Sequence, residues 1–116
     1  CKVSTGRWID PYSGNLVERA SDLDVDHVIP LSYAHENGGF SWPIFLKQEF
    51  AQDQENLLLV TDSINQSKGA KGPSFFLPRK GYQCEYASIW ASVTDKYQLN
   101  LPTGDKAEIR KILREC

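Results

Sequence analysis

The sequence predicts an α+β fold, in which a small unit of two antiparallel strands and a helix is surrounded by further helices and an N-terminal hairpin. Residues 24–26 alternate acidic and apolar side chains, and the chain then runs through Val28 and Ile29 to Pro30. This pattern is typical of a short strand that stops at a proline, because proline cannot extend a β-ladder. Residues 56–69 begin with an apolar, strand-forming run and then take helical spacing up to a glycine. With 116 residues, 41% of them hydrophobic, the chain can bury one core. We therefore expect one domain over residues 1–116, with the strand–strand–helix unit over about residues 22–72.

The N-terminal segment predicts a hairpin. Residues 7–9 and 16–17 are strand candidates, and residues 10–15 between them are rich in turn-forming Asp, Pro, Ser, Gly and Asn.

Two short helices are expected between the two halves of the central unit. The first covers residues 31–37 and ends at a pair of glycines. The second is expected to be capped by Ser41, with an apolar face formed by Phe45, Leu46 and Phe50.

Two amphipathic helices are expected at the C-terminal end. Residues 82–97 carry apolar side chains at helical spacing, namely Tyr86, Ile89, Trp90, Val93 and Tyr97. A last helix is expected over about residues 105–114, with four inward-facing side chains, Ala107, Ile109, Ile112 and Leu113.

The central unit also carries the residues that predict chemistry. The order of strands and helix would let Asp26 and Asn65 meet, and both offer hard oxygen ligands of the kind that Mg²⁺ or Mn²⁺ prefers. His27 lies beside this pair and can act as a base near neutral pH. Adjacent residues of a regular strand point to opposite faces, so we expect the strand to twist or end at this step.

A basic segment follows the central unit. No acidic residue occurs between residues 63 and 84, although the whole chain has a net charge of −2. The segment contains four cations, Lys68, Lys71, Arg79 and Lys80. They either contact nucleic-acid phosphates or are a chance local excess of charge, and we favour phosphate contact for Lys68 and Lys71, which flank the predicted ligand helix.

The pair Asp26-His27, followed by Asn56 before an apolar strand and Asn65 on the next helix, resembles the HNH endonucleases, also called ββα-metal or His-Me finger nucleases. Over the whole chain, the sequence is similar to secreted bacterial HNH nucleases and to the C-terminal domain of some modification-dependent restriction enzymes. The shared features are a Cys-x-Val-x-x-Gly-x-Trp opening, an Asn-x-Ser-Lys-Gly-x-Lys helix end, a Cys-x-Tyr-x-x-x-Trp helix and a terminal cysteine.

The resemblance implies that Asp26 and Asn65 bind a divalent metal ion, that His27 is the general base and that Asn56 braces the loop that holds this histidine. Asn65 stands where many relatives have histidine, which favours an oxygen-preferring ion, Mg²⁺ or else Mn²⁺. The implied activity is hydrolysis of phosphodiester bonds in DNA, or in RNA, one strand at a time. Little sequence specificity is expected, because no recognition helix or zinc finger is evident.

The cysteines carry information about the cellular compartment in which the protein works. Three cysteines without a Cys-x-x-Cys pair argue against a structural zinc site. A disulfide between Cys84 and Cys116 is expected to join the last two helices and to contribute roughly 2–4 kcal/mol. Cys1 would then be left for an upstream partner. A disulfide favours a secreted or extracytoplasmic protein of bacterial or phage-like origin, whereas three free buried thiols would fit a cytosolic one.

Other biological roles stay open at this point. We expect a monomer that binds nucleic acid and no membrane, because no apolar run approaches a membrane span. The absence of methionine predicts a processed or excised fragment, with a lipoprotein starting at Cys1 as a less favoured alternative. The same chemistry would also suit the toxin domain of a secreted effector, with an immunity protein as its partner. A catalytically silent nucleic-acid-binding module, or a disulfide-linked interaction domain, is the alternative from outside the enzymes.

Overall fold

The computed structural model describes residues 5–116, which form two separate two-stranded antiparallel sheets and five α-helices. The predicted α+β class is therefore confirmed. The elements in chain order are β1 (Thr5–Ile9), β2 (Leu16–Arg19), β3 (Leu23–His27), α1 (Leu31–Glu36), α2 (Ile44–Gln52), β4 (Leu57–Thr61), α3 (Asp62–Lys68), α4 (Gln83–Tyr97) and α5 (Thr103–Arg114).

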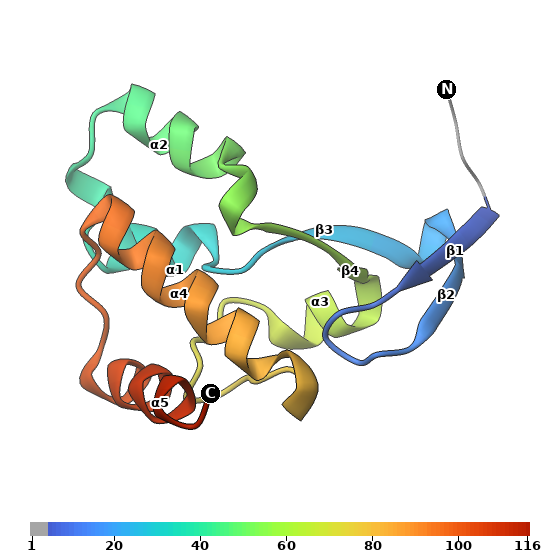
Figure 1. Ribbon diagram of the computed structural model, residues 1–116. Helices are drawn as coiled ribbons and strands as arrows, with labels where there is room; N and C mark the ends of the chain where they lie inside the picture. The colour runs from blue at the N-terminus through green and yellow to red at the C-terminus, as the bar shows by residue number, and fades with distance from the viewer. Residues whose placement is uncertain (1–4) are drawn as a thin grey trace.

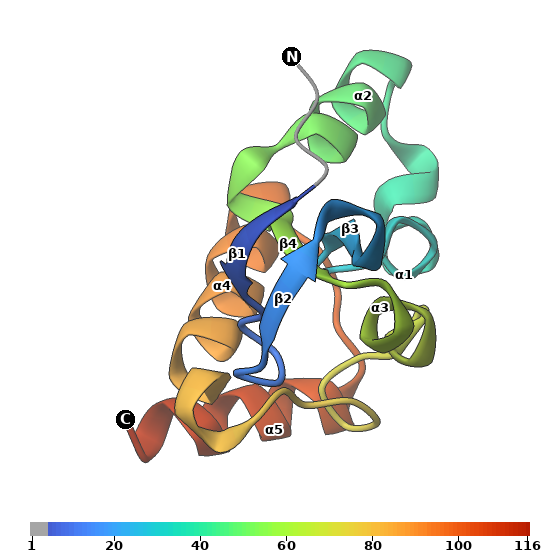
Figure 2. The same cartoon turned by 90° about the vertical axis from the view of Figure 1, so that its right-hand side faces the viewer.

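Strands β3 and β4 lie in the middle of the arrangement. Figure 1 shows the hairpin β1–β2 at one end of the molecule and α2 at the other, with β3, β4 and α3 between them. Figure 2, viewed from the hairpin side, shows α3 and α4 on opposite sides of the strands and α5 below them. No helix among the described residues is both long enough and apolar enough to cross a membrane.

The N-terminal hairpin forms where the sequence predicts it, with Trp8 opposite Val17 and Ile9 opposite Leu16. Its turn is held by Asp10, which is fully buried and accepts hydrogen bonds from the backbone N–H of Tyr12 at 3.0 Å and from the Ser13 hydroxyl at 2.8 Å. Asp10 also accepts a bond from the Thr61 hydroxyl at 2.8 Å. One carboxylate therefore shapes the turn and ties the hairpin to β4.

The central unit follows the predicted order of strand, strand and helix. β3 pairs antiparallel with β4, so that Asp26 lies opposite Leu58 and His27 opposite Leu57. α3 starts directly after β4, and Gly69 ends it with a φ of +54°, a left-handed conformation that glycine adopts without a steric penalty.

The core lies under α4 and is rich in aromatic side chains. Trp90 and Tyr86 are fully buried, and the predicted apolar face of α4 is confirmed. T-shaped ring pairs join α4 to its neighbours, Trp90 to Tyr33 of α1 at 5.0 Å between centroids and Tyr97 to Phe50 of α2 at 4.9 Å. Burying each of these large side chains contributes about 1.5–3 kcal/mol, so these contacts position α1 and α2 beside the strands.

The prediction for α2 is wrong in two details. Ser41 does not cap the helix, because it lies in a separate 3₁₀ turn and its hydroxyl donates to the carbonyl oxygen of Gly38 at 3.2 Å. The helix begins at Ile44, and Phe45 is 66% exposed instead of buried. Trp42, before the helix, packs on Phe50 in its place, with 5.5 Å between the ring centroids.

The prediction for α5 is also corrected at its buried face. Ile109 and Ile112 are buried, but Ala107 and Leu113 are exposed. Asp105 is buried in their stead and accepts hydrogen bonds from the Tyr33 hydroxyl and from the Ser74 backbone N–H. A paired carboxylate thus occupies a position that hydrophobic spacing alone would assign to an apolar residue.

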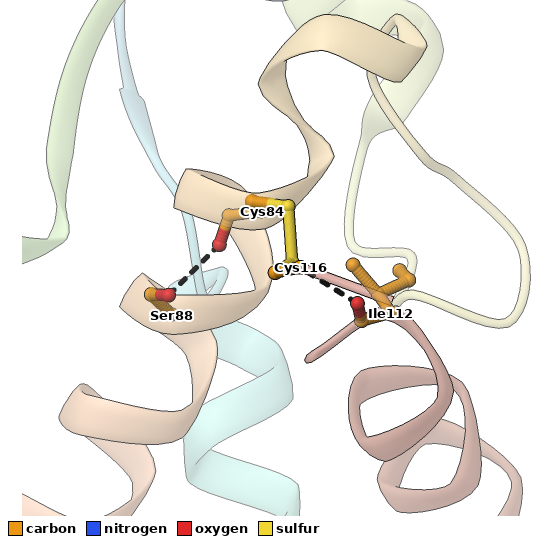
Figure 3. The surroundings of a disulfide bond; sticks show 4 residues. All are labelled: Cys84, Ser88, Ile112 and Cys116. Atoms are coloured by element: carbon orange, nitrogen blue, oxygen red, sulfur yellow. Dashed lines mark hydrogen bonds between the residues drawn. A yellow bond between two sulfur atoms is a disulfide. The ribbon is translucent and has the colours of Figure 1, made fainter. Parts of the chain in front are cut away.

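The expected disulfide between Cys84 and Cys116 is present and joins the start of α4 to the second residue after the end of α5 (Figure 3). The Cα atoms are 5.9 Å apart and the two cysteines are separated by 32 residues. A loop of this length is expected to contribute about 3–4 kcal/mol through the reduced entropy of the unfolded chain. Cys1, the expected leftover thiol, lies outside the described residues.

Candidate functional site

A surface cavity of about 450 Å³ lies where β3, α1 and the end of α3 meet. Its lining includes Asp26 and His27 from β3, Leu31 from α1 and Asn65 from α3. Both strand neighbours border this cavity, although adjacent residues of a regular strand point to opposite faces, and the ladder with β4 continues through His27. A larger cavity of about 550 Å³ lies between β2 and the start of α3, but none of the predicted metal-binding or catalytic residues borders it.

His27 is half-buried and its orientation is fixed by the backbone of α2. Its Nε2 lies 2.9 Å from the carbonyl oxygen of Ala51. A carbonyl oxygen can only accept a hydrogen bond, so Nε2 must carry the proton. The neutral ring therefore keeps its lone pair on Nδ1, which is the nitrogen left to accept a proton.

Asp26 is almost completely buried, with 4% of its surface exposed. Its Oδ2 accepts a hydrogen bond of 2.6 Å from the Tyr12 hydroxyl, and its Oδ1 lies 3.4 Å from the Nζ of Lys68. Burial raises the pKa of Tyr12 far above its usual range, and the nearby Tyr86 and Asp26 add to this effect. Tyr12 therefore stays protonated and donates to Asp26 at physiological pH.

Asn65 is oriented by a neighbouring acid. Its Nδ2 donates a 2.9 Å hydrogen bond to Oδ2 of the exposed Asp24. An ionised carboxylate only accepts, so the amide nitrogen must face Asp24 and the amide oxygen is left available to another partner. Asp24 therefore contacts the predicted metal ligand Asn65 directly.

Asn56 is fully buried and braces the chain just after His27. Its Oδ1 accepts from the Ile29 backbone N–H at 2.8 Å, and its Nδ2 donates to the Ile29 carbonyl oxygen at 3.0 Å. The backbone oxygen of Asn56 also accepts from the Val28 N–H at 2.9 Å. Three bonds thus fix the two residues that follow the histidine, which is the bracing geometry expected of Asn56.

The donor set can be tested against the implied metal. Asp26 and Asn65 both line one cavity and carry a carboxylate and an amide oxygen, and such hard ligands fit Mg²⁺ or Mn²⁺ with water and phosphate in the remaining positions. Over residues 5–116, no group of three or more His, Cys, Asp or Glu side chains is placed to hold a metal.

The structure divides the four predicted cations. Lys68 is fully buried, and its Nζ donates to the carbonyl oxygen of His27 at 3.0 Å. Burial lowers the pKa of Lys68, and the Asp26 carboxylate opposes this shift. Lys68 therefore does not lie in an exposed phosphate-contacting strip.

The other three cations are exposed, and each has different surroundings. The Nζ of Lys71 donates to the Ser67 carbonyl oxygen at 3.0 Å, just beyond the end of α3. The Nε of Arg79 donates to the Pro11 carbonyl oxygen at 3.1 Å, on the N-terminal hairpin. Lys80 lines a small cavity of about 140 Å³ together with Cys84, near the disulfide. Lys71 is thus the exposed cation adjacent in sequence to the cavity-lining Gly69 and Ala70.

Comparison with known proteins gives a family match over most of the chain. Residues 1–112 match the model of the family described as GmrSD restriction endonucleases, C-terminal domain. A relative from Arthroderma benhamiae is 40% identical over 119 residues, which cover all of this chain and 58% of the relative. That relative is described as an uncharacterized secreted protein. No solved structure matches this chain.

Proposed function

This chain belongs to the family of GmrSD restriction endonuclease C-terminal domains, and on that basis we propose that it is an HNH-type, metal-dependent endonuclease domain. In this proposal it hydrolyses phosphodiester bonds of DNA with little sequence specificity. His27 is the general base, and Asp26 and Asn65 are the metal ligands.

The observation that carries the proposal is the hydrogen bond from His27 Nε2 to the Ala51 carbonyl oxygen, 2.9 Å, beside the cavity that Asp26 and Asn65 also line. It leaves Nδ1 as the basic atom of the ring. In the proposed reaction Nδ1 takes a proton from the attacking water. The resulting imidazolium still donates its Nε2 hydrogen bond to the Ala51 carbonyl oxygen. A positioned base of this kind contributes about 10²–10⁴-fold to the rate.

The oxygens of Asp26 and Asn65 would hold Mg²⁺ or Mn²⁺. When bound, the ion supplies Lewis-acid stabilisation of the negative charge that develops on the scissile phosphate. Tyr12 orients Asp26, Asp24 orients Asn65, and Asn56 holds the backbone after His27. The chain's own contribution is thus to fix the base and the ligands before substrate arrives.

DNA is proposed as the substrate because the family is described as restriction endonucleases. Lys71 and Arg79 are exposed and can contact phosphates, which carry no sequence information. Weak sequence preference follows from this mode of binding. The chain spans 58% of its relative's length, so the substrate and partners of a longer protein also belong to this proposal.

We also propose that the domain works outside the cytoplasm as a monomer. The support is the description of the relative as secreted and the Cys84–Cys116 disulfide, which persists in oxidising compartments. The bacterial or phage-like origin stays a prediction.

The test is cleavage of supercoiled plasmid DNA in Mg²⁺, Mn²⁺ or EDTA. The wild type is expected to nick the plasmid with either ion, and EDTA is expected to stop the reaction. His27→Ala should lose about 10²-fold or more in rate. A parallel incubation with RNA of similar length measures the preference for DNA.

The chain offers a matched control, because it contains two histidines and His35 is exposed on α1. His35→Ala should nick at the wild-type rate. A folded wild type that cuts neither DNA nor RNA with any ion would favour a nucleic-acid-binding module instead.

A further inference from the structure

Lys68 is the buried cation of the candidate site, and the reaction proposed above gives it no role. It is the last residue of α3 and is fully buried. Its Nζ contacts two neighbouring residues of β3, lying 3.0 Å from the carbonyl oxygen of His27 and 3.4 Å from Oδ1 of Asp26. One ammonium group therefore connects the residue expected to bind metal with the residue expected to act as base.

A direct contact between Lys68 and the substrate does not fit this geometry. A phosphate oxygen would have to approach within about 2.7–2.9 Å of Nζ, but no part of the Lys68 side chain reaches the surface. The ammonium is directed inward, toward β3. Lys71 lies three residues further along the chain and is exposed, so it can make such a contact.

The position of Lys68 on its helix adds a second link. Asn65 and Lys68 are three residues apart on α3, so they lie on neighbouring positions of one face. The same turn of helix thus carries one predicted metal ligand and the cation that contacts the other. Movement of α3 relative to β3 would change the Asn65-to-Asp26 distance and the Lys68 contacts together.

We propose that Lys68 is a positioning residue: its buried ammonium bridges the Asp26 carboxylate and the His27 carbonyl oxygen and fixes the metal-binding carboxylate relative to the general base. The proposal rests on the function proposed above and adds a residue to its machinery. Tyr12 holds the other oxygen of Asp26 at 2.6 Å, so removal of Lys68 leaves the carboxylate with one hydrogen-bond donor and freedom to turn about it.

The test compares Lys68→Met with Lys71→Met in the full chain. Mn²⁺ affinity is measured by the electron paramagnetic resonance signal of free Mn²⁺, without nucleic acid, and the single-turnover cleavage rate is measured at saturating DNA. Lys68→Met should weaken Mn²⁺ binding and slow cleavage, each by about 10–100-fold, and leave the salt dependence of DNA affinity unchanged. Lys71→Met should instead lower the salt slope of DNA affinity by about 1 and leave Mn²⁺ affinity unchanged.

Two further variants separate positioning from loss of stability. Ile64 precedes Lys68 by one turn and packs against the core, so Ile64→Val lowers stability without touching Asp26; its Mn²⁺ affinity should equal that of the wild type. Lys68→Gln keeps a hydrogen-bond donor and serves if Lys68→Met does not fold. It should weaken Mn²⁺ binding in the same direction by a smaller factor.

The outcomes distinguish this proposal from the function on which it rests. Mn²⁺ affinity unchanged in Lys68→Met or Lys68→Gln would overturn the positioning role, and a reduced salt slope would return Lys68 to phosphate contact. A wild type that binds Mn²⁺ but cuts nothing would contradict the proposed nuclease, and the Mn²⁺ affinities alone would then decide the role of Lys68. A wild type without Mn²⁺ affinity would contradict both.

Discussion

Asp24 and the Ala51 carbonyl act on the candidate site in the same way, because each can only accept a hydrogen bond. Asp24 holds the amide nitrogen of Asn65 and leaves its oxygen available, and Ala51 holds Nε2 of His27 and leaves Nδ1 available. Each acceptor therefore decides which atom of its partner is left for chemistry.

Replacing Asp24 with Ala should raise the Mg²⁺ concentration for half-maximal cleavage by about tenfold, because Asn65 loses the partner that orients its oxygen. Asp24→Asn still offers an oxygen acceptor and should recover most of the loss. Asp22→Ala removes an exposed acid nearby and should match the wild type. A Mg²⁺ titration of cleavage provides the measurement. Equal effects of Asp22→Ala and Asp24→Ala would instead indicate a general electrostatic attraction for the ion.

Sequence reasoning finds residues whose type carries a chemical signal and misses those that act through folding. Asp26, His27 and Asn65 are recognisable by type and spacing, and the structure places them around one cavity. Tyr12 contacts Asp26 only because the N-terminal hairpin folds against β3, and no local pattern encodes this. Lys68 is an intermediate case. It follows the partly buried Ile64 by four residues, so helical periodicity already places it on the inward face.

At the scale of elements, hydrogen bonds connect the end of α2 to α4, close in sequence to Ala51, whose carbonyl oxygen binds His27. Asp53 follows α2 and accepts hydrogen bonds from Lys96 at 2.7 Å and from the Tyr97 hydroxyl at 2.6 Å. Partial burial by itself would raise the pKa of Asp53, but the bonds from Lys96, Tyr97 and the Glu55 backbone N–H lower it below its usual value. The anionic form of Asp53 therefore stabilises the fold.

Because the pKa of Asp53 is lower in the folded chain, its contribution is complete above the unfolded value of 3.8 and is lost as the pH falls through the folded value. Asp53→Asn should reduce stability at pH 7 by at most about 1 kcal/mol, since the group is partly exposed to solvent. The variant should also lose less stability than the wild type on acidification from pH 5 to pH 2. Urea unfolding at each pH provides the measurement, with the exposed Asp95→Asn as control. Identical pH profiles for wild type and Asp53→Asn would contradict this role.

The elements differ in how well the sequence predicts them. α4 has strong helical periodicity over 15 residues, and its buried face is the predicted one. α2 is short, and the competing aromatic Trp42 lies just outside it, so tertiary packing decides which ring is buried. The burial of Asp105 on α5 is not predicted by hydrophobic spacing, because its hydrogen-bond partners, Tyr33 and Ser74, are distant in the sequence.

At the scale of the whole molecule, the disulfide and the candidate site lie on different elements. Cys84 and Cys116 join α4 to the residues after α5, whereas the candidate site lies where β3, α1 and the end of α3 meet. Loss of the disulfide is therefore expected to lower stability without changing the cleavage rate of the folded protein.

Replacing both Cys84 and Cys116 with Ser should lower the free energy of unfolding by about 3–4 kcal/mol, measured by urea unfolding against the oxidised wild type. Cleavage by the variant at a temperature where it is folded should stay near the wild-type rate. Loss of cleavage in the folded variant would show that the disulfide also positions the site.

The most direct measurement of the central claim separates base from ligand in one variant. For His27→Ala, Mn²⁺ affinity and DNA affinity are measured beside the single-turnover cleavage rate. We predict cleavage slowed by about 10²–10⁴-fold with both affinities close to those of the wild type, because Asp26 and Asn65 still supply the metal ligands. A parallel loss of Mn²⁺ affinity would instead make His27 a metal ligand, and unchanged cleavage would remove it from the reaction.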